Sequence, residues 1–246
     1  MLVDELSCNQ AHKILATDGG VSFEGSLETM YRVNLYSRIA TRVLSRVGQG
    51  TYTTEEDIYK ATFKLNWPSW FKVNQTIRVK VTGVKCPLKS LDFVTLRIKD
   101  AVCDRFREEG ALRPSVSVRD PDVRIHAYLT QNQYQLYLDT SGAPLYQRGF
   151  RDVSVIAPLR ENLAAGIIML SGWKPGTPFL DPMCGSGTFL IEAAMIAVNQ
   201  PPGLKRHFGF QHLKSFDETL WKKIETEAIA KMKPIEFLEI YGSDMD

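Results

Sequence analysis

The sequence predicts two successive fold classes, a mixed α+β region over about the first 140 residues and then the beginning of an α/β domain. Residues 76–82, 123–129 and 135–139 alternate apolar and polar side chains, as half-buried strands do, and helical patterns lie between them. Near residue 181 a short apolar strand runs into a glycine-rich turn and then an apolar helix. That order of elements is typical of the start of a βαβ unit.

The first region opens with a pair of strands over residues 12–24, which turn at Asp18–Gly20. Residues 26–47 follow with apolar side chains at helical spacing, and Ser26 is a suitable N-cap, so they predict one long helix. Thr54 is the N-cap expected for the next helix, because three acidic residues follow it in the first turn. A helix over 91–107 separates the first of the three alternating strands from the other two, and we expect antiparallel pairs among them.

The second region begins after Gly142 and Pro144 with an amphipathic helix over residues 158–170. A strand over 178–181 and an apolar helix over 189–198 follow. A helical segment over 217–232 precedes a second strand near Ile240.

Composition excludes several classes of protein. The chain has 246 residues, of which 44% are hydrophobic and 24% charged, which is typical of a globular protein with a packed core. No apolar run reaches the length that a membrane-spanning helix needs, and no secretory signal is visible, so we expect a cytoplasmic protein. The four cysteines are scattered without a CxxC pair, which argues against a disulfide framework and against zinc. His207 and His212 are better interpreted as surface histidines than as metal ligands.

Cationic side chains are unevenly distributed although the net charge is only +2. Two interpretations stay open on charge alone: contacts with nucleic-acid phosphates, or solvation of helix and strand faces. The first cluster contains Arg78, Lys80, Lys85, Lys89, Arg97, Lys99, Arg105 and Arg107, and the second contains Arg148, Arg151 and Arg160.

The stretch from Asp181 to Thr188 is the most informative motif. Two glycines two residues apart, at the carboxyl end of a strand, permit a tight turn and a close approach of the backbone to a ligand. The helix that follows directs free N–H groups and the positive end of its dipole to the same place. Neither GxGxxG nor GxxxxGK is present, which weighs against dinucleotide and P-loop sites. The expected ligand-binding residues are Asp181, Pro182, Met183, Cys184, Gly185, Ser186, Gly187 and Thr188.

A second acid is expected at the end of the next strand, where it can hold ribose hydroxyls. Asp244 is the better candidate and Asp246 the second. Because 63 residues separate Asp181 from Asp244, where a minimal unit has about 20, residues 200–233 are predicted to be an insertion.

These strings resemble the THUMP-domain RNA methyltransferases over nearly the whole chain, and most of all the bacterial enzymes that methylate the N2 amine of a guanine in 23S ribosomal RNA. The resemblance is carried by Leu145–Asp152, Ala157–Ala165, Asp181–Thr188 and Ile191–Ala194. It implies a ferredoxin-like subdomain over residues 1–50, whose opening elements would precede Met1. It also implies a THUMP domain over 51–142, starting at about residue 28 in the family's own span, a linker over 143–157, and the first part of a Rossmann-like class I methyltransferase domain over 158–246.

The resemblance implies S-adenosylmethionine as cofactor and RNA, expected to be 23S rRNA, as partner, with neither DNA nor a membrane. Lys85, Lys89, Arg97, Arg148 and Arg151 are the candidates for RNA contact. For Arg148 and Arg151 a structural clamp between domains is an equal alternative.

The family's catalytic Asn-Pro-Pro-aromatic motif would lie beyond residue 246, and that motif supplies the acceptors for the guanine amine. Asn199–Pro202 is no substitute, since it follows the first helix and lacks the aromatic residue, so we interpret it as a helix terminator. We therefore expect this chain alone to be inactive and to bind cofactor weakly. The alternatives are a non-catalytic THUMP RNA-binding protein and an amino-methylase that acts on another base of DNA or RNA.

Overall fold

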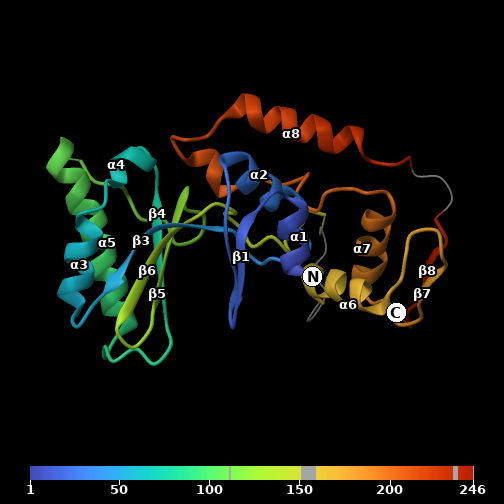
Figure 1. Ribbon diagram of the computed structural model, residues 1–246, viewed down its shortest axis with the longest axis horizontal. Coiled ribbons are helices and arrows are strands. Elements are labelled where there is room, and N and C mark those ends of the chain that lie inside the picture. Colours follow the sequence, from blue (N-terminus) through green and yellow to red (C-terminus); the bar gives the residue numbers. More distant parts are fainter. Residues whose placement is uncertain (111, 151–158, 235–237, 246) are drawn as a thin grey trace. The chain divides into compact units, whose positions relative to one another are not determined.

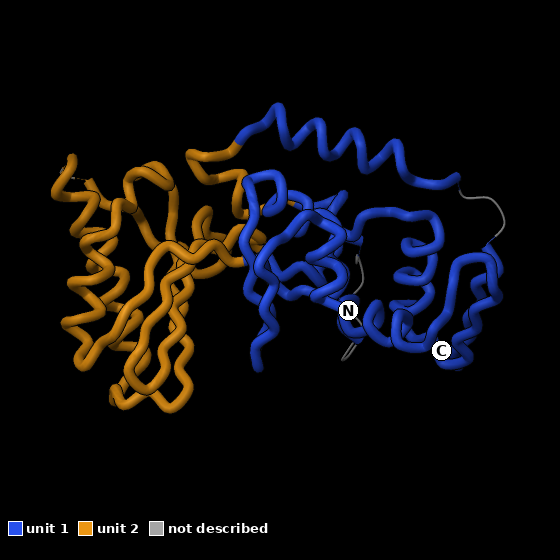
Figure 2. The backbone as a smooth tube through the Cα atoms, viewed as in Figure 1, with its two compact units in different colours: residues 1–43, 143–206, 217–246 blue, residues 44–142, 207–216 orange. Residues whose placement is uncertain are grey.

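The computed structural model of the chain describes residues 1–110, 112–150, 159–234 and 238–245. It divides into two compact units, neither of which is continuous in sequence. Unit 1 comprises residues 1–43, 143–206 and 217–246, and unit 2 comprises residues 44–142 and 207–216 (Figure 2).

Unit 2 is built on a four-stranded sheet with the strand order β3-β6-β5-β4. Its strands are β3 (Leu44–Thr51), β4 (Ile77–Gly83), β5 (Val123–Leu129) and β6 (Gln133–Asp139). The expected antiparallel pairing is confirmed for β5–β6, and β3, which was not expected as a strand, also pairs antiparallel with β6. The expectation is wrong for β4–β5, which run parallel. The long helix α5 (Leu91–Gly110) is a crossover connection that returns the chain to the end of the sheet at which β4 begins, so β5 runs in the same direction as β4.

Helices cover one face of this sheet. α3 (Glu55–Phe63), α4 (Trp67–Trp70) and α5 lie together on the same side (Figure 1). Trp67 and Phe71 are fully buried in the core beneath them, and the Trp67 indole nitrogen donates to the Thr62 carbonyl at 2.8 Å. The core also contains Ile58, Ile77, Ile98, Ile125, Leu129 and Leu136.

The predicted start of α3 is confirmed in detail. Thr54 caps the helix, its hydroxyl accepting from the Asp57 amide at 3.3 Å. The Asp57 carboxylate in turn accepts from the amides of Thr54 at 2.9 Å and Thr53 at 3.0 Å, which completes a capping box.

The N-terminal part of unit 1 contains α1 (Leu2–Cys8), the hairpin of β1 (His12–Thr17) and β2 (Gly20–Glu24), and α2 (Leu27–Tyr36). The prediction of one helix over residues 26–47 is wrong beyond Tyr36. Just past that point the Glu5 carboxylate accepts from the Ser37 hydroxyl at 2.6 Å and the Arg38 amide at 2.9 Å. These bonds from a distant side chain replace the ones that a continuing helix would make, and residues 44–51 become β3 instead.

The rest of unit 1 contains α6 (Glu161–Ser171), β7 (Phe179–Asp181), α7 (Thr188–Ala197), α8 (Glu218–Ala230) and β8 (Ile240–Gly242). β7 and β8 pair in parallel, as a βαβ arrangement requires. Part of the predicted insertion, with the short helix η1 (Gly209–His212), packs in unit 2. Among the described residues, no helix is long and apolar enough to cross a membrane.

Candidate functional site

The carboxyl ends of β7 and β8 lie side by side at one edge of their small sheet. The register pairs Asp181 with Gly242, so the segments that follow both strands leave the sheet at the same level. The Ser243 amide donates to the Asp181 carbonyl and the Cys184 amide donates to the Ser243 carbonyl, each at 3.0 Å. The two turns are thereby tied to one another, although 59 residues separate Cys184 from Ser243.

The glycine turn has the backbone conformation that the motif predicted. Gly185 has φ 50° and Gly187 has φ 73°, both in the left-handed region that side chains disfavour. Gly187 is the N-cap of α7, and its amide donates to the Cys184 carbonyl at 2.8 Å. A Cβ atom added at Gly185 would meet nothing within 4 Å, so the turn is open to a ligand at that position.

Asp244 lies directly against the glycine turn. Its Oδ2 accepts from the Gly185 amide at 2.6 Å, and its Oδ1 accepts from the Met245 amide at 2.8 Å. On the other strand, Oδ1 of Asp181 accepts from the Met183 amide at 3.2 Å. The structure therefore brings the two predicted acids to one turn, at the N-terminus of α7.

The other predicted ligand residues are part of the same turn. The Ser186 and Thr188 hydroxyls are 3.3 Å apart, and the Pro182 carbonyl accepts from the Ser243 hydroxyl at 3.3 Å. Met183 is exposed and Cys184 half-buried. Asp246 lies outside the described residues. The roles of all these residues as ligands stay a prediction.

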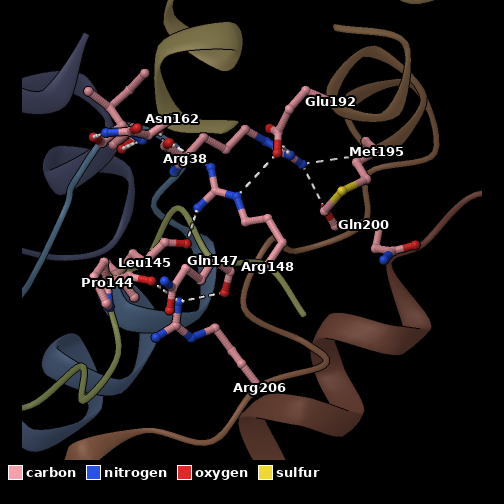
Figure 3. A network of polar contacts seen from close by, with 12 residues as sticks. Arg38, Pro144, Leu145, Gln147, Arg148, Asn162, Glu192, Met195, Gln200 and Arg206 are labelled. Atoms are coloured by element: carbon pink, nitrogen blue, oxygen red, sulfur yellow. Dashed lines mark hydrogen bonds and ion pairs between the residues drawn. The ribbon is translucent and has the colours of Figure 1, made fainter. Parts of the chain in front are cut away.

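Glu192 of α7 belongs to a buried network of ion pairs that was not predicted from the sequence. The Glu192 side chain is 0% exposed, and its Oε1 is 3.1 Å from Nε of Arg148. Oε2 is 3.7 Å from Nη1 of Arg38 (Figure 3). Burial raises the pKa of Glu192 and lowers the pKa of Arg38. The signal available in the sequence was that Glu192 is the only charged residue in α7.

The Arg148 side chain is buried within this network and is not presented at the surface. It is 3% exposed. Besides Glu192, it donates from Nη1 to the Leu145 carbonyl at 2.6 Å and from Nη2 to the Arg38 carbonyl at 2.7 Å. Of the two interpretations of Arg148, these contacts favour the structural clamp over RNA contact. Arg151 lies outside the described residues.

The remaining RNA candidates belong to unit 2. Lys85 and Lys89 are exposed in the loop between β4 and α5, and Lys85 has φ 54°. Arg97 forms an ion pair with Glu56, and its guanidinium lies 4.1 Å from the centre of the Tyr59 ring. Their roles in RNA binding stay a prediction.

Asn199 and His212 each contact a segment that is distant in the sequence. Asn199, with φ 54°, follows the end of α7, and its side chain donates to the Lys231 carbonyl at 2.9 Å, so this segment terminates a helix. His212 is 3.7 Å from the Asp122 carboxylate. Within the described ranges, no three His, Cys, Asp or Glu side chains converge as metal ligands would.

Comparison with known protein families assigns a domain to each part of the chain. Residues 1–44 match the RlmL ferredoxin-like domain, residues 52–139 match the THUMP domain, and residues 148–246 match the RMKL-like methyltransferase domain.

Solved structures resemble the whole chain. A predicted N6-adenine-specific DNA methylase from Listeria monocytogenes is 31% identical with a TM-score of 0.89, and the match covers 100% of this chain and 64% of that one. SMU.472, a putative methyltransferase complexed with SAH, is 32% identical with a TM-score of 0.88 and coverages of 99% and 64%. A possible methylase from Clostridium difficile 630 is 29% identical with a TM-score of 0.89 and coverages of 100% and 65%.

The chain thus spans slightly less than two thirds of the length of these solved relatives. Its own three domains follow one another in the order that the sequence resemblance implied. By these matches the chain resembles, in this order, an RlmL-type ferredoxin-like domain, a THUMP domain and the RMKL-like methyltransferase domain.

Proposed function

We propose that the chain is the RNA-binding and cofactor-binding portion of an S-adenosylmethionine-dependent RNA methyltransferase. The cofactor-binding part of this proposal rests on one observation. The Asp244 carboxylate accepts a hydrogen bond from the Gly185 amide, at the carboxyl ends of two parallel strands and at the N-terminus of α7. Ligands of open α/β sheets bind at this kind of edge. The presence of SAH in the SMU.472 relative supports the same cofactor class.

The residues of the turn suit the parts of this cofactor. A carboxylate such as Asp181 accepts hydrogen bonds from an ammonium group, and the amides at the start of α7 donate to a carboxylate. A carboxylate such as that of Asp244 can accept hydrogen bonds from ribose hydroxyls. The open space at Gly185 admits the ligand close to the backbone. When bound, S-adenosylmethionine supplies an electrophilic methyl group, and these residues orient it.

Amide chemical shifts test the cofactor proposal even if this chain binds weakly. We expect titration with S-adenosylhomocysteine into the ¹⁵N-labelled chain to move the resonances of Gly185, Gly187 and Thr188. Asp181→Asn should weaken the response, whereas Asp18→Asn, in the exposed β1–β2 turn, should leave it unchanged. Shifts confined to other regions, or no shifts at millimolar ligand, would contradict the proposal.

For the substrate we propose the N2 amine of a guanine in 23S ribosomal RNA. The resemblance supports this choice, and the THUMP domain supports RNA as the partner. An Asp181→Ala allele in the source organism should remove one N2-methylguanosine from 23S rRNA, as measured by mass spectrometry of nucleoside digests.

The name of the Listeria relative supports a second candidate, N6-adenine methylation of DNA. The same allele distinguishes the two, because it would then lower N6-methyladenine in DNA and leave the rRNA unchanged. If neither modification changes, the alternative of a non-catalytic RNA-binding protein is favoured.

A further inference from the structure

The four-stranded sheet of unit 2 has a polar face opposite its helices. Because side chains alternate along a strand, Ile77, Val79 and Val81 of β4 point to the core, and Arg78 and Lys80 point the other way. We call this second side the strand face, and its members used here are Arg46, Arg78, Lys80, His126, Tyr128 and Tyr137.

Strand register aligns these side chains in rows. Lys80 pairs with His126, His126 with Tyr137, and Tyr137 with Arg46, so one row crosses all four strands. The neighbouring row carries Tyr128, which is 38% exposed. Arg46, Arg78 and Lys80 are exposed as well. Directly opposed side chains lie about 5 Å apart, so the row is continuous.

Three cations of the strand face, Arg46, Arg78 and Lys80, have no acidic partner among the described residues. On the same face, Arg124 of β5 lies 3.6 Å from the Asp120 carboxylate, and His126 lies 3.2 Å from that of Asp139. Within the described part of the chain, neither Arg46 nor Lys80 has a carboxylate at ion-pair distance, and Arg78 donates to the Val118 carbonyl at 2.8 Å. The acid that the four strands contribute, Asp139, has a fully buried side chain. The strand face is therefore positively charged.

The cations of α5 have the opposite environment. Arg97 pairs with Glu56, Arg105 with Glu108 and Glu109, and Arg107 with Asp104. The cationic cluster in the sequence therefore separates into a neutralised helix surface and an unneutralised strand face. Unlike the surface of α5, the strand face offers phosphates charges that are not already occupied by a carboxylate.

Aromatic rings lie among these cations. Tyr137 hydrogen-bonds the Gln135 side chain, and burial raises the pKa of Tyr137, so its ring stays neutral. Tyr128 presents an exposed ring beside it. Cations interleaved with aromatic rings on an open sheet are typical of surfaces that bind single strands, because unstacked bases lie on the rings and phosphates on the cations.

We infer that the strand face binds single-stranded RNA, with its phosphates on Arg46, Arg78 and Lys80 and a base stacked on Tyr128. This inference rests on the proposed RNA-binding function, and it places the contact on the sheet rather than on α5. A duplex fits less well, because its bases are stacked within the helix and cannot reach an exposed ring.

Fluorescence anisotropy with a short, labelled single-stranded RNA tests the assignment across a salt series. Each single-strand phosphate contact contributes about 0.7 to the slope of log affinity against log salt, so Arg78→Gln with Lys80→Gln should lower the slope by about 1.4. The matched control, Arg105→Gln with Arg107→Gln, removes the same charge from α5 and should leave slope and affinity within about twofold. Circular dichroism verifies that both variants are folded.

A second pair of variants separates stacking from charge. Tyr128→Ala should weaken binding by about tenfold or more, whereas Tyr128→Phe should retain it, because the ring is what stacks. If the unsubstituted chain binds RNA but the strand variants do not weaken it, or the α5 pair weakens it equally, the strand face is the wrong surface and the proposed function stands. If the unsubstituted chain prefers duplex RNA, the strand face assignment fails and RNA binding by the chain stands. If the chain binds no RNA, or prefers a protein, both fail together.

Discussion

Glu192 shows how a single buried charge supports the site. It lies one turn into α7, the helix whose N-terminus forms part of the glycine turn, and it pairs with two arginines from distant segments. Removing one partner from a buried ion pair leaves the other charge without compensation. We expect Glu192→Gln to lower the free energy of unfolding by about 3 kcal/mol in urea titrations followed by tryptophan fluorescence.

Glu218→Gln is the matched control for that variant. Glu218 is exposed on α8 and pairs with Lys222 one turn later, where solvent screens the interaction, so this substitution should change the free energy of unfolding far less. Equal losses from the two substitutions would show that the buried network is not what holds α7.

Sequence patterns identified the residues of the glycine turn better than the side chains that support the turn. Gly185 and Gly187 could be predicted because local backbone geometry demands glycine there. The Glu192–Arg148 pair could not, because the two residues are 44 positions apart and nothing local specifies the partner of a buried acid. For the same reason Arg148 was an RNA candidate on sequence grounds, whereas its contacts favour the clamp.

At the scale of elements, the start of α3 depends on the ionised form of Asp57. Amide donation from Thr54, then from Thr53, lowers the pKa of Asp57 below its usual value. A carboxyl whose pKa is lowered by folding contributes stability above its unfolded pKa of 3.8, and that contribution is lost as the pH falls through the folded value.

We therefore expect Asp57→Asn to make thermal stability less dependent on pH below about 4, the range in which the unsubstituted chain loses this contribution. Glu55→Gln, which removes a carboxylate from the same first turn, should retain the pH dependence of the unsubstituted chain. Differential scanning fluorimetry over an acid pH series measures both. If the thermal stability of Asp57→Asn varied with pH in the same way as that of the unsubstituted chain, the role assigned to the cap would be contradicted.

Elements with local signals were predicted well. The caps of α2 and α3, the strands β4 to β6 and the βαβ order around residue 181 all follow from spacing within a few residues. The helix expected over residues 26–47 failed because Glu5, from another helix, binds the backbone after Tyr36. The parallel pairing of β4 and β5 is likewise a property of the crossover helix and not of either strand's own sequence.

At the scale of the whole molecule, neither compact unit is a single stretch of chain. Residues 207–216 pack in unit 2, where the Phe210 amide donates to the Thr140 carbonyl at 2.9 Å and the Lys214 amide to the Trp70 carbonyl at 2.8 Å. Phe210 is 1% exposed and stacks on Phe208 with ring centres 5.1 Å apart. This segment therefore supplies part of the packing of the THUMP-containing unit.

Phe210→Ala should lower the free energy of unfolding by about 3–5 kcal/mol, since it deletes a buried aromatic ring. Phe93→Ala removes the same side chain from α5, where it is 50% exposed, and should cost less than about 1 kcal/mol. Urea unfolding of the two variants provides the comparison. A Phe210→Ala protein as stable as Phe93→Ala would mean that residues 207–216 do not contribute to packing.

Because unit 2 is discontinuous in sequence, the ribosome synthesises its parts at different times. The last strand of its sheet ends at Asp139, but the segment that completes its packing ends at Phe216, and everything between them belongs mainly to the other unit. At translation speeds of about 5–20 residues per second, the ribosome needs on the order of 4–15 s to make the intervening chain. During that interval the nascent sheet lacks the aromatic residues of segment 207–216 that complete its packing. The two units must therefore finish folding together rather than one after the other.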